Sequence, residues 1–494
     1  MKKLTELLRE DFKVYGDINK TIFSFAYNSK EVDQNSVFIA ISGLTIDGHI
    51  FIDEAIKKGA VAVVYETGRF TPHNKNITWI EVSDSRNALS WIASRFYDNP
   101  SKKLNLIGIT GTNGKTTTSF IIHHILKKAG KKTGVIGTIK YIIDNIEKTA
   151  IYTTPEAKEF QSLLQQMLMQ GVEYVVSEVS SHALALKRVD HTEFKIAVFT
   201  NLSRDHLDFH KDMESYFLAK RRLFTELLKE NGFAIINIDD TYGRKLATEL
   251  RKEKILYSLK NPEADLYVSN YNLKVKGTNI KIISKKNGKI SINSPLIGIP
   301  NIYNILAAVA VAEVLEVPLD IITEALKDFK APPGRFETVD EGQKFLAVVD
   351  YAHTPDALER LLLSLKDLKE QISKDGKIIT VFGCGGNRDR GKREQMGRIA
   401  TELSDYVILT SDNPRWEEPR QIIKDIENGV SKTNYIVVLD RIWAIKIAAK
   451  LCQKGDILVV AGKGHEDYQE IKGFRYPFSD VEILRKAIRE NVYS

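Results

Sequence analysis

The segment that most constrains the fold joins a buried strand to a helix through a glycine-rich loop. Residues 104–110 (LNLIGIT) form a mostly apolar run, which is typical of a strand covered on both faces. Residues 111–117 (GTNGKTT) follow at once, and the apolar residues after them recur with helical spacing as far as Gly130. A buried strand that leads into a helix is typical of a parallel α/β sheet.

The loop itself has the composition of a phosphate-binding site. Gly111 and Gly114 let the backbone fold tightly and present N–H groups to an anion. The helix N-terminus adds a partial positive charge. Lys115 can reach the β- and γ-phosphates of a nucleotide, and the Thr116 hydroxyl can ligate Mg²⁺. Ile109 stands where the strict Walker A spacing has glycine, so the loop alone indicates only a nucleotide phosphate; a glycine-rich turn without a nucleotide is the alternative.

The alternation of strands and helices continues along the chain. Strands are predicted at 174–178, 195–202 and 233–239, with a helix from Met213 to about Lys229 before the last of them. A polar, strand-rich section at about 255–295 is expected to extend one edge of this sheet. After Lys330–Glu337 (KAPPGRFE) the alternation restarts, and it predicts strands at 345–351, 378–382, 406–410, 435–439 and 457–461.

These breaks predict three domains. The 494 residues exceed what one hydrophobic core holds, and Asp98–Asn105 has the turn formers and charges of a linker. We therefore expect an α/β fold with a mixed α/β domain at 1–100, a central P-loop-type ATPase domain with a mostly parallel sheet at 101–331, and a C-terminal Rossmann-like domain at 332–494. Ligands of such open sheets bind at the carboxyl ends of the strands.

The composition narrows the partners and the compartment. Lysine and arginine exceed aspartate and glutamate by only 71 − 64 = 7, so no nucleic-acid partner is expected. Two cysteines, Cys384 and Cys452, make no disulfide framework and suit a reducing compartment. The start of the chain lacks the pattern of a secretory signal, and no apolar run approaches ~18 residues. We expect a cytoplasmic monomer that acts on small molecules, without a membrane partner.

The loop and several later motifs together resemble the Mur ligase and folylpolyglutamate synthetase superfamily. Residues 111–118 (GTNGKTTT) resemble its ATP loop at every position. The motifs Glu178–Leu184 (EVSSHAL), Thr200–Asp208 (TNLSRDHLD) and Asp350–Pro355 (DYAHTP) follow in family order and span nearly the whole chain. The ATP-binding residues that the resemblance implies are Gly111, Thr112, Asn113, Gly114, Lys115, Thr116, Thr117, Asn301, Asn304, Arg335, Asp350 and His353.

Three further motifs resemble the MurE type within this family. They are Thr153-Thr154-Pro155, Asp412-Asn413-Pro414-Arg415 and Gly464–Tyr468 (GHEDY). The resemblance implies an ATP-dependent acid–amino-acid ligase of peptidoglycan precursor synthesis. It would add meso-diaminopimelate to the D-glutamate γ-carboxylate of UDP-N-acetylmuramoyl-L-alanyl-D-glutamate through an acyl phosphate. The Asp-Asn-Pro-Arg form is similar to that of meso-diaminopimelate enzymes, and L-lysine is the alternative acceptor.

The resemblance also implies which residues perform the chemistry. Two anions, a carboxylate and a triphosphate, must meet, so Lys115 and Mg²⁺ would screen their repulsion. Lys220 lies where the family carries a lysine with a CO₂-derived carbamate, which would turn an ammonium into an anionic oxygen donor. Without the resemblance, Lys220 would be interpreted as a helix-surface lysine, and His206 is equally a structural histidine. The catalytic residues implied are Lys115, Glu178, His206 and Lys220, and the metal ligands are Thr116, Glu178, His206 and Lys220.

Substrate-binding residues are implied in all three domains. Ser29 matches a UDP-contacting serine, and Thr45 to His49 resemble a loop that faces the same nucleotide. Two arginines in the third domain suit an amino acid with two carboxylates, because each guanidinium can form a forked pair. Gly462 and Glu466 would bind the distal amino group. The full set implied is Ser29, Thr153, Thr154, Ser181, Arg188, Arg388, Asp412, Asn413, Pro414, Arg415, Gly462 and Glu466.

Alternatives to these assignments remain. Thr153–Pro155 is equally an ordinary turn, and Leu186 stands where some family members have glutamine. Folylpolyglutamate synthesis is a more distant ligase function. A nucleotide-binding ATPase without ligase activity is a different class, and it leaves the paired arginines unexplained. We also expect Lys330–Glu337 to act as a hinge that closes the third domain over ATP and brings Arg335 to the nucleotide.

Overall fold

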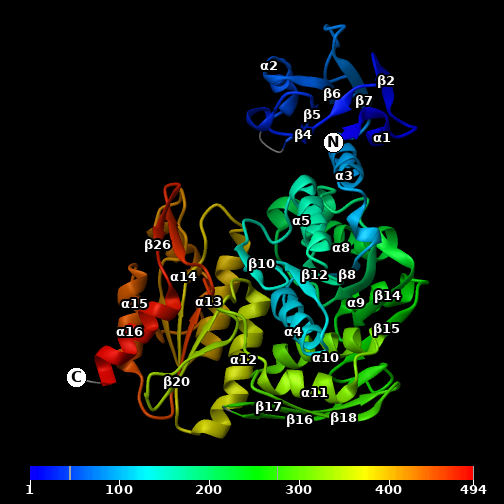
Figure 1. Cartoon of the computed structure of the whole chain (residues 1–494). Helices are drawn as coiled ribbons and strands as arrows, with labels where there is room; N and C mark the ends of the chain where they lie inside the picture. The colour runs from blue at the N-terminus through cyan, green and yellow to red at the C-terminus, as the bar shows by residue number, and fades with distance from the viewer. Residues whose placement is uncertain (44–45, 275, 493–494) are drawn as a thin grey trace. The chain divides into compact units, whose positions relative to one another are not determined.

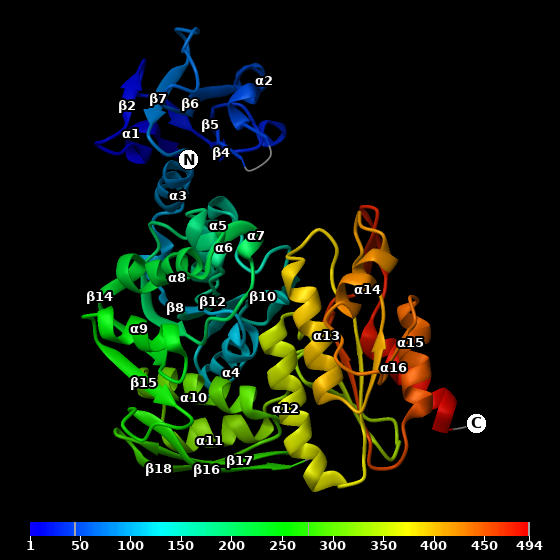
Figure 2. The ribbon, with the colours of Figure 1, turned by 180° about the vertical axis from the view of Figure 1, so that it is seen from behind.

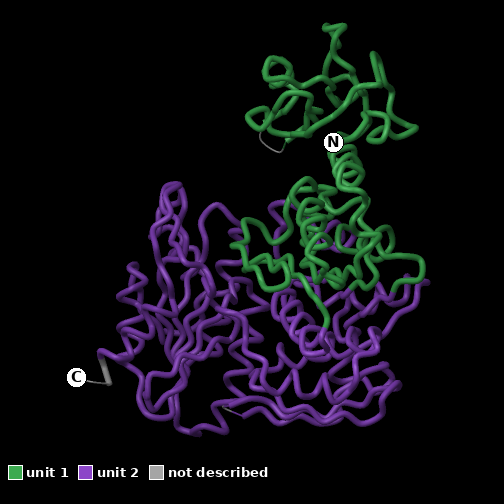
Figure 3. The backbone as a smooth tube through the Cα atoms, in the orientation of Figure 1, with its two compact units in different colours: residues 1–108, 131–197, 219–232 green, residues 109–130, 198–218, 233–494 purple. Residues whose placement is uncertain are grey.

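The computed structural model describes residues 1–43, 46–274 and 276–492, with the helices and strands labelled in Figure 1. The backbone divides into two compact units, drawn in different colours in Figure 3. The first unit comprises residues 1–108, 131–197 and 219–232. The second comprises residues 109–130, 198–218 and 233–494.

The first unit begins with a five-stranded sheet in the order β2-β7-β6-β5-β4. The central strands β5, β6 and β7 are parallel, and β2 pairs antiparallel at the edge. Helices α1 and α3 pack on one face and α2 on the other, so successive residues of β5 are all buried. The bounds are α1 Leu4–Leu7, β2 Lys13–Tyr15, β4 Ser24–Ala26, β5 Ser36–Ile39, α2 Ile52–Lys58, β6 Ala60–Glu66, β7 Thr78–Val82 and α3 Ser85–Phe96.

A second sheet has eleven strands in the order β11-β10-β9-β12-β8-β13-β14-β15-β16-β17-β18. Strand β12 lies parallel to β9, and β9, β10 and β11 form an antiparallel meander. The strand predicted before the glycine-rich loop is β8, and the helix after it is α4. The bounds are β8 Asn105–Thr110, α4 Lys115–Lys128, β9 Thr133–Ile136, β10 Lys140–Ile143, β11 Ile146–Thr149, α5 Ala157–Met169, β12 Tyr174–Glu178, α6 Ser181–Ala185 and β13 Phe194–Phe199.

In the second unit the sheet continues into the predicted polar extension. Strands β14, β15 and β16 pair in parallel, and β16, β17 and β18 form an antiparallel meander. Helix α11 packs on β18 and α10 packs on α4, as both views show (Figures 1 and 2). The bounds are α7 Leu207–His210, α8 Met213–Arg222, β14 Leu228–Asn237, α9 Thr241–Glu249, β15 Lys254–Ser258, β16 Leu266–Lys274, β17 Gly277–Ser284, β18 Gly288–Ser294, α10 Ile299–Val314 and α11 Leu319–Asp328.

The C-terminal part of the second unit is a separate six-stranded sheet in the order β19-β20-β24-β21-β22-β23. All pairs are parallel except the edge pair β19–β20, and helices cover both faces. The five predicted strands are all present. The bounds are β19 Glu337–Val339, β20 Leu346–Asp350, α12 Pro355–Ile372, β21 Ile378–Phe382, α13 Gly391–Leu403, β22 Tyr406–Leu409, α14 Pro419–Glu427, β23 Tyr435–Val437, α15 Arg441–Leu451, β24 Ile457–Ala461, β25 Tyr468–Ile471, β26 Phe474–Pro477 and α16 Asp480–Val492.

The helix predicted from Met213 to about Lys229 is present and ends two residues earlier. Helix α8 ends at Arg222, and a π-helical segment continues it over Leu223–Leu227. Strand β14 begins at Leu228, so Lys229 lies on a strand. The buried residues of the π-helical segment are Leu223, Phe224 and Leu227.

The fold class predicted from sequence is confirmed: the protein is mixed α/β, with a large sheet and smaller flanking sheets. Across residues 1–43, 46–274 and 276–492, no helix has the length and apolarity needed to cross a bilayer.

Candidate functional site

The glycine-rich loop adopts a backbone that only glycine allows at two positions. Gly111 has φ +151° and Gly114 has φ +85°. A Cβ on Gly111 would lie 1.9 Å from Thr200 Oγ1, and one on Gly114 would lie 2.5 Å from Asn304 Oδ1. Both contacts are far inside van der Waals distance, so the chain can pass here only without side chains. The predicted strand–loop–helix arrangement is confirmed.

Lys115 opens α4 and its side chain folds back over the loop. The Nζ atom donates to the carbonyl oxygens of Gly111 and Thr112, both at 2.9 Å. The Thr112 hydroxyl lies 3.2 Å from the carbonyl oxygen of Ser203. The ammonium is thus held at the loop, where it can neutralise a phosphate that the backbone N–H groups bind.

Helix α10 brings the two predicted asparagines to the same loop. Asn304 donates through Nδ2 to Asn301 Oδ1 at 3.0 Å, and Asn301 donates to the Ile297 carbonyl at 2.8 Å. The Thr118 hydroxyl donates to Asn304 Oδ1 at 3.2 Å. This chain of bonds fixes which way each amide faces. Asn301 and Asn304 line one pocket together with Asn113 and Gly114.

The same pocket is also lined by residues from the predicted hinge and from the segment after it. Arg335, Asp350, Tyr351 and Arg360 line it. Arg335 Nη2 lies 3.3 Å from Thr116 Oγ1, and its guanidinium carbon stands 4.4 Å from the centre of the Tyr351 ring. Its buried Nε has no hydrogen-bond partner in the described part of the chain. A buried, unsatisfied guanidinium N–H beside a phosphate loop is suited to an anion.

Asp350 and His353 make hydrogen bonds within the chain around β20. The Asp350 carboxylate accepts from the backbone N–H of Phe336 at 2.7 Å and of Ala352 at 2.8 Å. Burial raises the pKa of Asp350, and Arg335 opposes this. His353 donates through Nδ1 to the Tyr351 carbonyl at 2.8 Å, and burial lowers the pKa of His353 to about 4. Both side chains therefore hold the loop after β20.

His206 and Asp205 lie at the N-terminus of α7. His206 has φ +55°, and its Nε2 is 3.3 Å from Asp205 Oδ2. Burial alone would raise the pKa of Asp205, but the charges of His206, His353 and Lys392 outweigh it and hold that pKa at about 2. Asp205 is therefore a carboxylate anion near neutral pH. His353 Nε2 lies 4.0 Å from the same Oδ2 atom.

In the first unit, the end of β12 gathers the predicted glutamate and threonines. Glu178 is fully buried, and its two oxygens accept from the backbone N–H and the hydroxyl of Thr138, both at 2.9 Å. The hydroxyls of Thr138 and Thr153 are 3.1 Å apart. The sequence analysis did not single out Thr138. Its place directly after β9, at the carboxyl end of a strand, was the available signal.

Thr154 and Arg188 meet at the same strand end. The Thr154 hydroxyl donates to the Glu178 carbonyl at 2.8 Å and accepts from Ser180 N–H at 3.0 Å. Arg188 donates to the Thr154 carbonyl at 3.2 Å, and its Nε lies 3.2 Å from Glu156 Oε2. Ser180 caps α6, which begins at the predicted Ser181. Thr153–Pro155 is thus tied to the end of β12.

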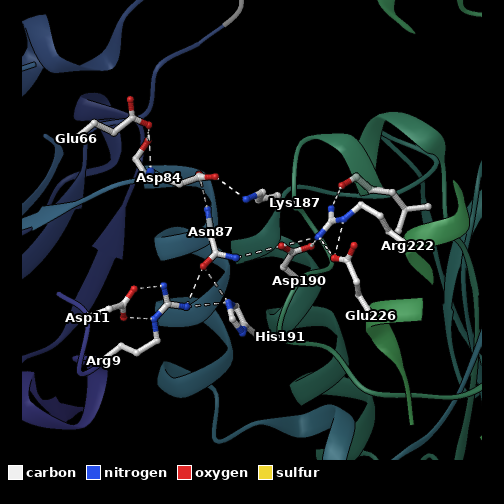
Figure 4. A network of polar contacts seen from close by, with 12 residues as sticks. Arg9, Asp11, Glu66, Asp84, Asn87, Lys187, Asp190, His191, Arg222 and Glu226 are labelled. Carbon is white, nitrogen blue, oxygen red and sulfur yellow. Dashed lines mark hydrogen bonds and ion pairs between the residues drawn. The ribbon is translucent and has the colours of Figure 1, made fainter. Parts of the chain in front are cut away.

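Lys220 is 1% exposed, so the alternative of a helix-surface lysine is wrong. Two residues later, Arg222 anchors the end of α8, as Figure 4 shows. Its Nη2 lies 3.0 and 3.1 Å from the oxygens of Asp190, and its Nε donates to Glu226 at 2.8 Å. Asn87 of α3 also donates to Asp190, at 3.1 Å, so the network extends to helix α3.

A cavity of about 700 Å³ opens beside this network, lined by residues that include Trp91, Arg95, His191 and Arg222. None of the predicted site residues lines it.

In the N-terminal sheet domain, Ser29 lies in a short 3₁₀ helix and is buried; its carbonyl accepts from Lys58 Nζ at 3.1 Å. His49 uses both ring nitrogens. Nδ1 donates to Asp47 at 2.6 Å, and Nε2 accepts from Glu66 N–H at 2.9 Å. His49 thus holds its loop in place. Thr45 lies outside the described residues.

In the C-terminal domain, Arg415 has a left-handed backbone with φ +52°. Its N–H donates to the Glu470 carbonyl at 3.0 Å, and its carbonyl accepts from Lys472 N–H at 2.7 Å, so β25 holds it on both sides. The guanidinium donates through Nε to Glu470 Oε2 at 3.2 Å and through Nη1 to the Gly386 carbonyl at 2.8 Å. A non-glycine residue held in this region is typical of a functional site.

The loop that precedes the predicted Arg388 is held by a buried arginine that the sequence analysis missed. Arg393 of α13 is fully buried, and it pairs with Glu417 at 2.9 Å and with Asp425 at 2.7 Å. Its Nη2 also donates to the Gly385 carbonyl at 3.2 Å. The local sequence does not distinguish Arg393 from the exposed arginines near it. Its acidic partners lie more than twenty residues later in the chain, Asp425 on α14 and Glu417 just before that helix.

The Asp-Asn-Pro-Arg turn lies against the loop after β24. Asn413 donates through Nδ2 to Glu466 Oε2 at 2.8 Å. Gly462 has φ +116°, and a Cβ there would lie 2.9 Å from Asp412 Oδ2. Asp412 Oδ1 accepts from Asn413 N–H at 2.6 Å. The predicted residues Asp412, Asn413, Pro414, Arg415, Gly462 and Glu466 therefore form one cluster at the carboxyl ends of β22 and β24.

Cys384 lies near this cluster and is buried. Burial raises the pKa of its thiol to about 12, and its Sγ is 3.7 Å from Met396 Sδ. A thiol with such a pKa stays protonated at neutral pH.

Three family models match the chain in sequence order. The Mur ligase family, catalytic domain model matches residues 22–97, the Mur ligase middle domain model matches 109–312, and the Mur ligase, glutamate ligase domain model matches 334–464. Together they span most of the chain.

Similar proteins agree with these models. A UDP-N-acetylmuramoyl-L-alanyl-D-glutamate–2,6-diaminopimelate ligase from Clostridium tetani is 44% identical over 494 residues, covering 99% of each chain. One of the same name from Aquifex aeolicus is 46% identical over 473 residues, covering 95% of this chain and 94% of its own. A solved structure with that name has a TM-score of 0.70 and 33% identity, covering 100% of both chains.

Proposed function

The chain belongs to the Mur ligase family, and from this membership we propose that it adds meso-diaminopimelate to UDP-N-acetylmuramoyl-L-alanyl-D-glutamate at the expense of ATP. The observation that carries the choice of acceptor is the cluster around Arg415. The backbone of Arg415 is held by β25, and its guanidinium can bind a carboxylate. Glu466, which accepts from Asn413, can bind an ammonium through its carboxylate. The distal end of meso-diaminopimelate carries both groups.

We assign ATP to the second unit's phosphate loop. The backbone N–H groups of 111–117 and Lys115 would hold the phosphates, and Asn301 and Asn304 would line the site of the base. Arg335 would meet the phosphates with its unsatisfied Nε. The pocket lining and the glycine geometry support this assignment.

We propose Mg²⁺ as the metal cofactor, with the ligands that the resemblance implies. Thr116 offers a hydroxyl and Glu178 a buried carboxylate that Thr138 orients, and magnesium prefers oxygen ligands. His206 is the further candidate ligand. When bound, the metal would neutralise phosphate charge. A carbamate on Lys220 is part of the proposal because the family membership implies it.

The reaction proceeds in two steps. An oxygen of the D-glutamate γ-carboxylate attacks the γ-phosphorus of ATP; the bond to the bridging oxygen breaks, and ADP leaves. The neutral amine of the acceptor then attacks the acyl carbon, and the bond from that carbon to the phosphate oxygen breaks. Inorganic phosphate leaves, and the nitrogen releases a proton to solvent as the amide forms. Lys115 stabilises the charge that moves onto ADP. Thr153, Thr154, Ser181 and Arg188 would hold the peptide end, and Ser29 the uridine end.

The rest of the proposal concerns which part of the chain binds each substrate. We assign the UDP moiety to residues 1–100, ATP to 101–331 and the amino acid to 332–494. The ranges matched by the three family models support this division. We further propose a monomer that acts in the cytoplasm.

A substrate panel tests the proposal. Phosphate release from ATP is measured with the muramoyl dipeptide and, in turn, meso-diaminopimelate, L-lysine and D-lysine. The expected result is release that requires the dipeptide and is fastest with meso-diaminopimelate. Preference for L-lysine would select the alternative acceptor. Release that is independent of the dipeptide would identify an ATPase without ligase activity and overturn the proposal.

A further inference from the structure

Lys463 is a buried lysine at the centre of the acceptor cluster. It lies two residues after β24, and its side chain is 0% exposed. Its Nζ donates to Asn413 Oδ1 at 3.0 Å and to Glu466 Oε2 at 2.9 Å. The rings of Tyr468 and Phe478 stand 5.5 and 5.8 Å from the same atom. A lysine is rarely buried to this extent unless it is paired, so its place here requires both oxygen partners.

The ammonium decides which way the Asn413 amide faces. Asn413 Oδ1 accepts from Lys463 Nζ and from the backbone N–H of Glu470, the latter at 2.9 Å. Both groups are donors only, so the atom between them must be the amide oxygen. The amide nitrogen then faces Glu466 Oε2, to which it donates at 2.8 Å.

The same ammonium orients Glu466. Two donors, Lys463 Nζ and Asn413 Nδ2, converge on its Oε2 atom. This arrangement turns one oxygen of the carboxylate toward the protein. Without the lysine, Glu466 would lose its charged partner, and the Asn413 amide oxygen would keep only the Glu470 N–H as a donor.

We propose that Lys463 is a positioning residue that sets Asn413 and Glu466 to receive the amino group of the acceptor amino acid. The inference rests on the proposed function and deepens it: Glu466 Oε2 is held by the protein, and Oε1 is the oxygen that accepts the substrate's ammonium. Lys463 does not touch the substrate. It acts through the two residues that do, so its loss weakens acceptor binding and leaves the ATP and dipeptide sites as they are.

Lys463→Met tests this because methionine keeps much of the side-chain length and removes the charge. The expected result is a KM for meso-diaminopimelate that is about tenfold to a hundredfold higher, since hydrogen bonds to charged groups are lost. The KM values for ATP and the muramoyl dipeptide should change less than about twofold, a margin within the spread of ordinary surface substitutions. Lys450, exposed at the end of α15, gives the matched control K450M, which should behave as the wild type.

A second readout separates positioning from folding. Hydroxylamine traps the acyl phosphate from ATP and dipeptide without any amino acid, so hydroxamate formation does not use the acceptor cluster. K463M should form hydroxamate at the wild-type rate. An unchanged acceptor KM, or an equal loss in trapping, overturns the role of Lys463. Wild-type protein that forms no hydroxamate overturns the proposed function instead.

A conservative variant keeps the test decisive if K463M does not fold. Lys463→Arg retains the charge, but it replaces the compact ammonium between the two oxygens by a larger, planar guanidinium. We expect K463R to raise the acceptor KM with trapping unchanged. Wild-type acceptor KM in K463R would show that charge alone suffices and would overturn the positioning role.

Discussion

Arg335 Nη2 lies 3.3 Å from the hydroxyl of Thr116, so the segment predicted as a hinge, Lys330–Glu337, reaches the phosphate loop directly. The neighbouring Gly334 has φ +65°, and a Cβ on it would lie 2.0 Å from the backbone nitrogen of His465. Two adjacent residues of this segment therefore contact the phosphate loop and the loop after β24.

Replacing Arg335 by alanine should weaken ATP binding. The guanidinium stands over the Tyr351 ring and has an unsatisfied buried N–H, so its loss removes a charge-assisted donor without removing a structural ion pair. We expect the KM for ATP to rise about tenfold or more, as for a hydrogen bond to a charged group. Steady-state kinetics at saturating dipeptide and amino acid measures it, and R420A, at an exposed position on α14, is the control.

Arg415→Ala should damage the meso-diaminopimelate reaction selectively. The guanidinium is the group that would pair with the distal carboxylate, which L-lysine lacks. We expect kcat/KM for meso-diaminopimelate to fall at least about 30-fold, as for the loss of one partner of a buried charge pair. Turnover with L-lysine should change little. An equal fall with both acceptors, measured by phosphate release, would mean that Arg415 only supports the loop.

The buried pair of Arg441 and Asp480 should contribute strongly to the stability of the C-terminal domain. Both side chains are 0% exposed and joined by bonds of 2.7 and 2.8 Å, and Arg441 also donates to the Ala461 carbonyl at the end of β24. Asp480→Asn leaves a buried guanidinium without its anion. We expect a loss of about 3–5 kcal/mol in the free energy of unfolding, measured by urea denaturation.

The exposed pair Lys446–Glu490 provides the contrast for that experiment. Its side chains are 30% and 45% exposed at 2.9 Å separation. Glu490→Gln should cost less than about 1 kcal/mol, because water screens exposed pairs. Equal losses in the two variants would contradict the assignment of stability to burial.

His465 should make stability depend on pH. Burial, with Arg335, His353 and Lys463 adding to it, lowers the pKa of His465 to about 3, and its Nδ1 is buried without a partner in the described part of the chain. The unfolded chain has a histidine pKa of about 6.5 and binds the proton more tightly. The stabilisation from neutral His465 is therefore complete above pH ~6.5 and is lost as the pH falls toward 3.

His465→Asn removes this titration. We expect the difference in unfolding free energy between wild type and H465N to shrink steadily as the pH falls below about 6.5. Denaturant unfolding at several pH values between 7 and 4 measures it. A constant difference across that range would show that His465 does not titrate as its burial requires.

Local sequence was sufficient wherever a short segment carries its own physical constraint. The loop at 111–117 needs glycine at two positions and a lysine at the helix start, and these three requirements are visible in seven residues. Strand ends were also predictable, because apolar runs mark strands and ligands gather at their carboxyl ends. Thr138 could have been found by that rule. The change from α-helix to π-helix at Leu223 had no such local signal.

The sequence by itself determined the class of fold, the place of the phosphate loop and the family of the chain, because these depend on periodicity and on motifs that are contiguous. Only the tertiary structure decided which charged residues are buried. Lys220, Arg393, Arg441 and Lys463 look like surface residues in their segments, and each is buried by elements distant in the chain. The left-handed backbone of Arg415 is likewise held by β25, more than fifty residues away. Burial and strain arise from packing between segments, which local sequence does not encode.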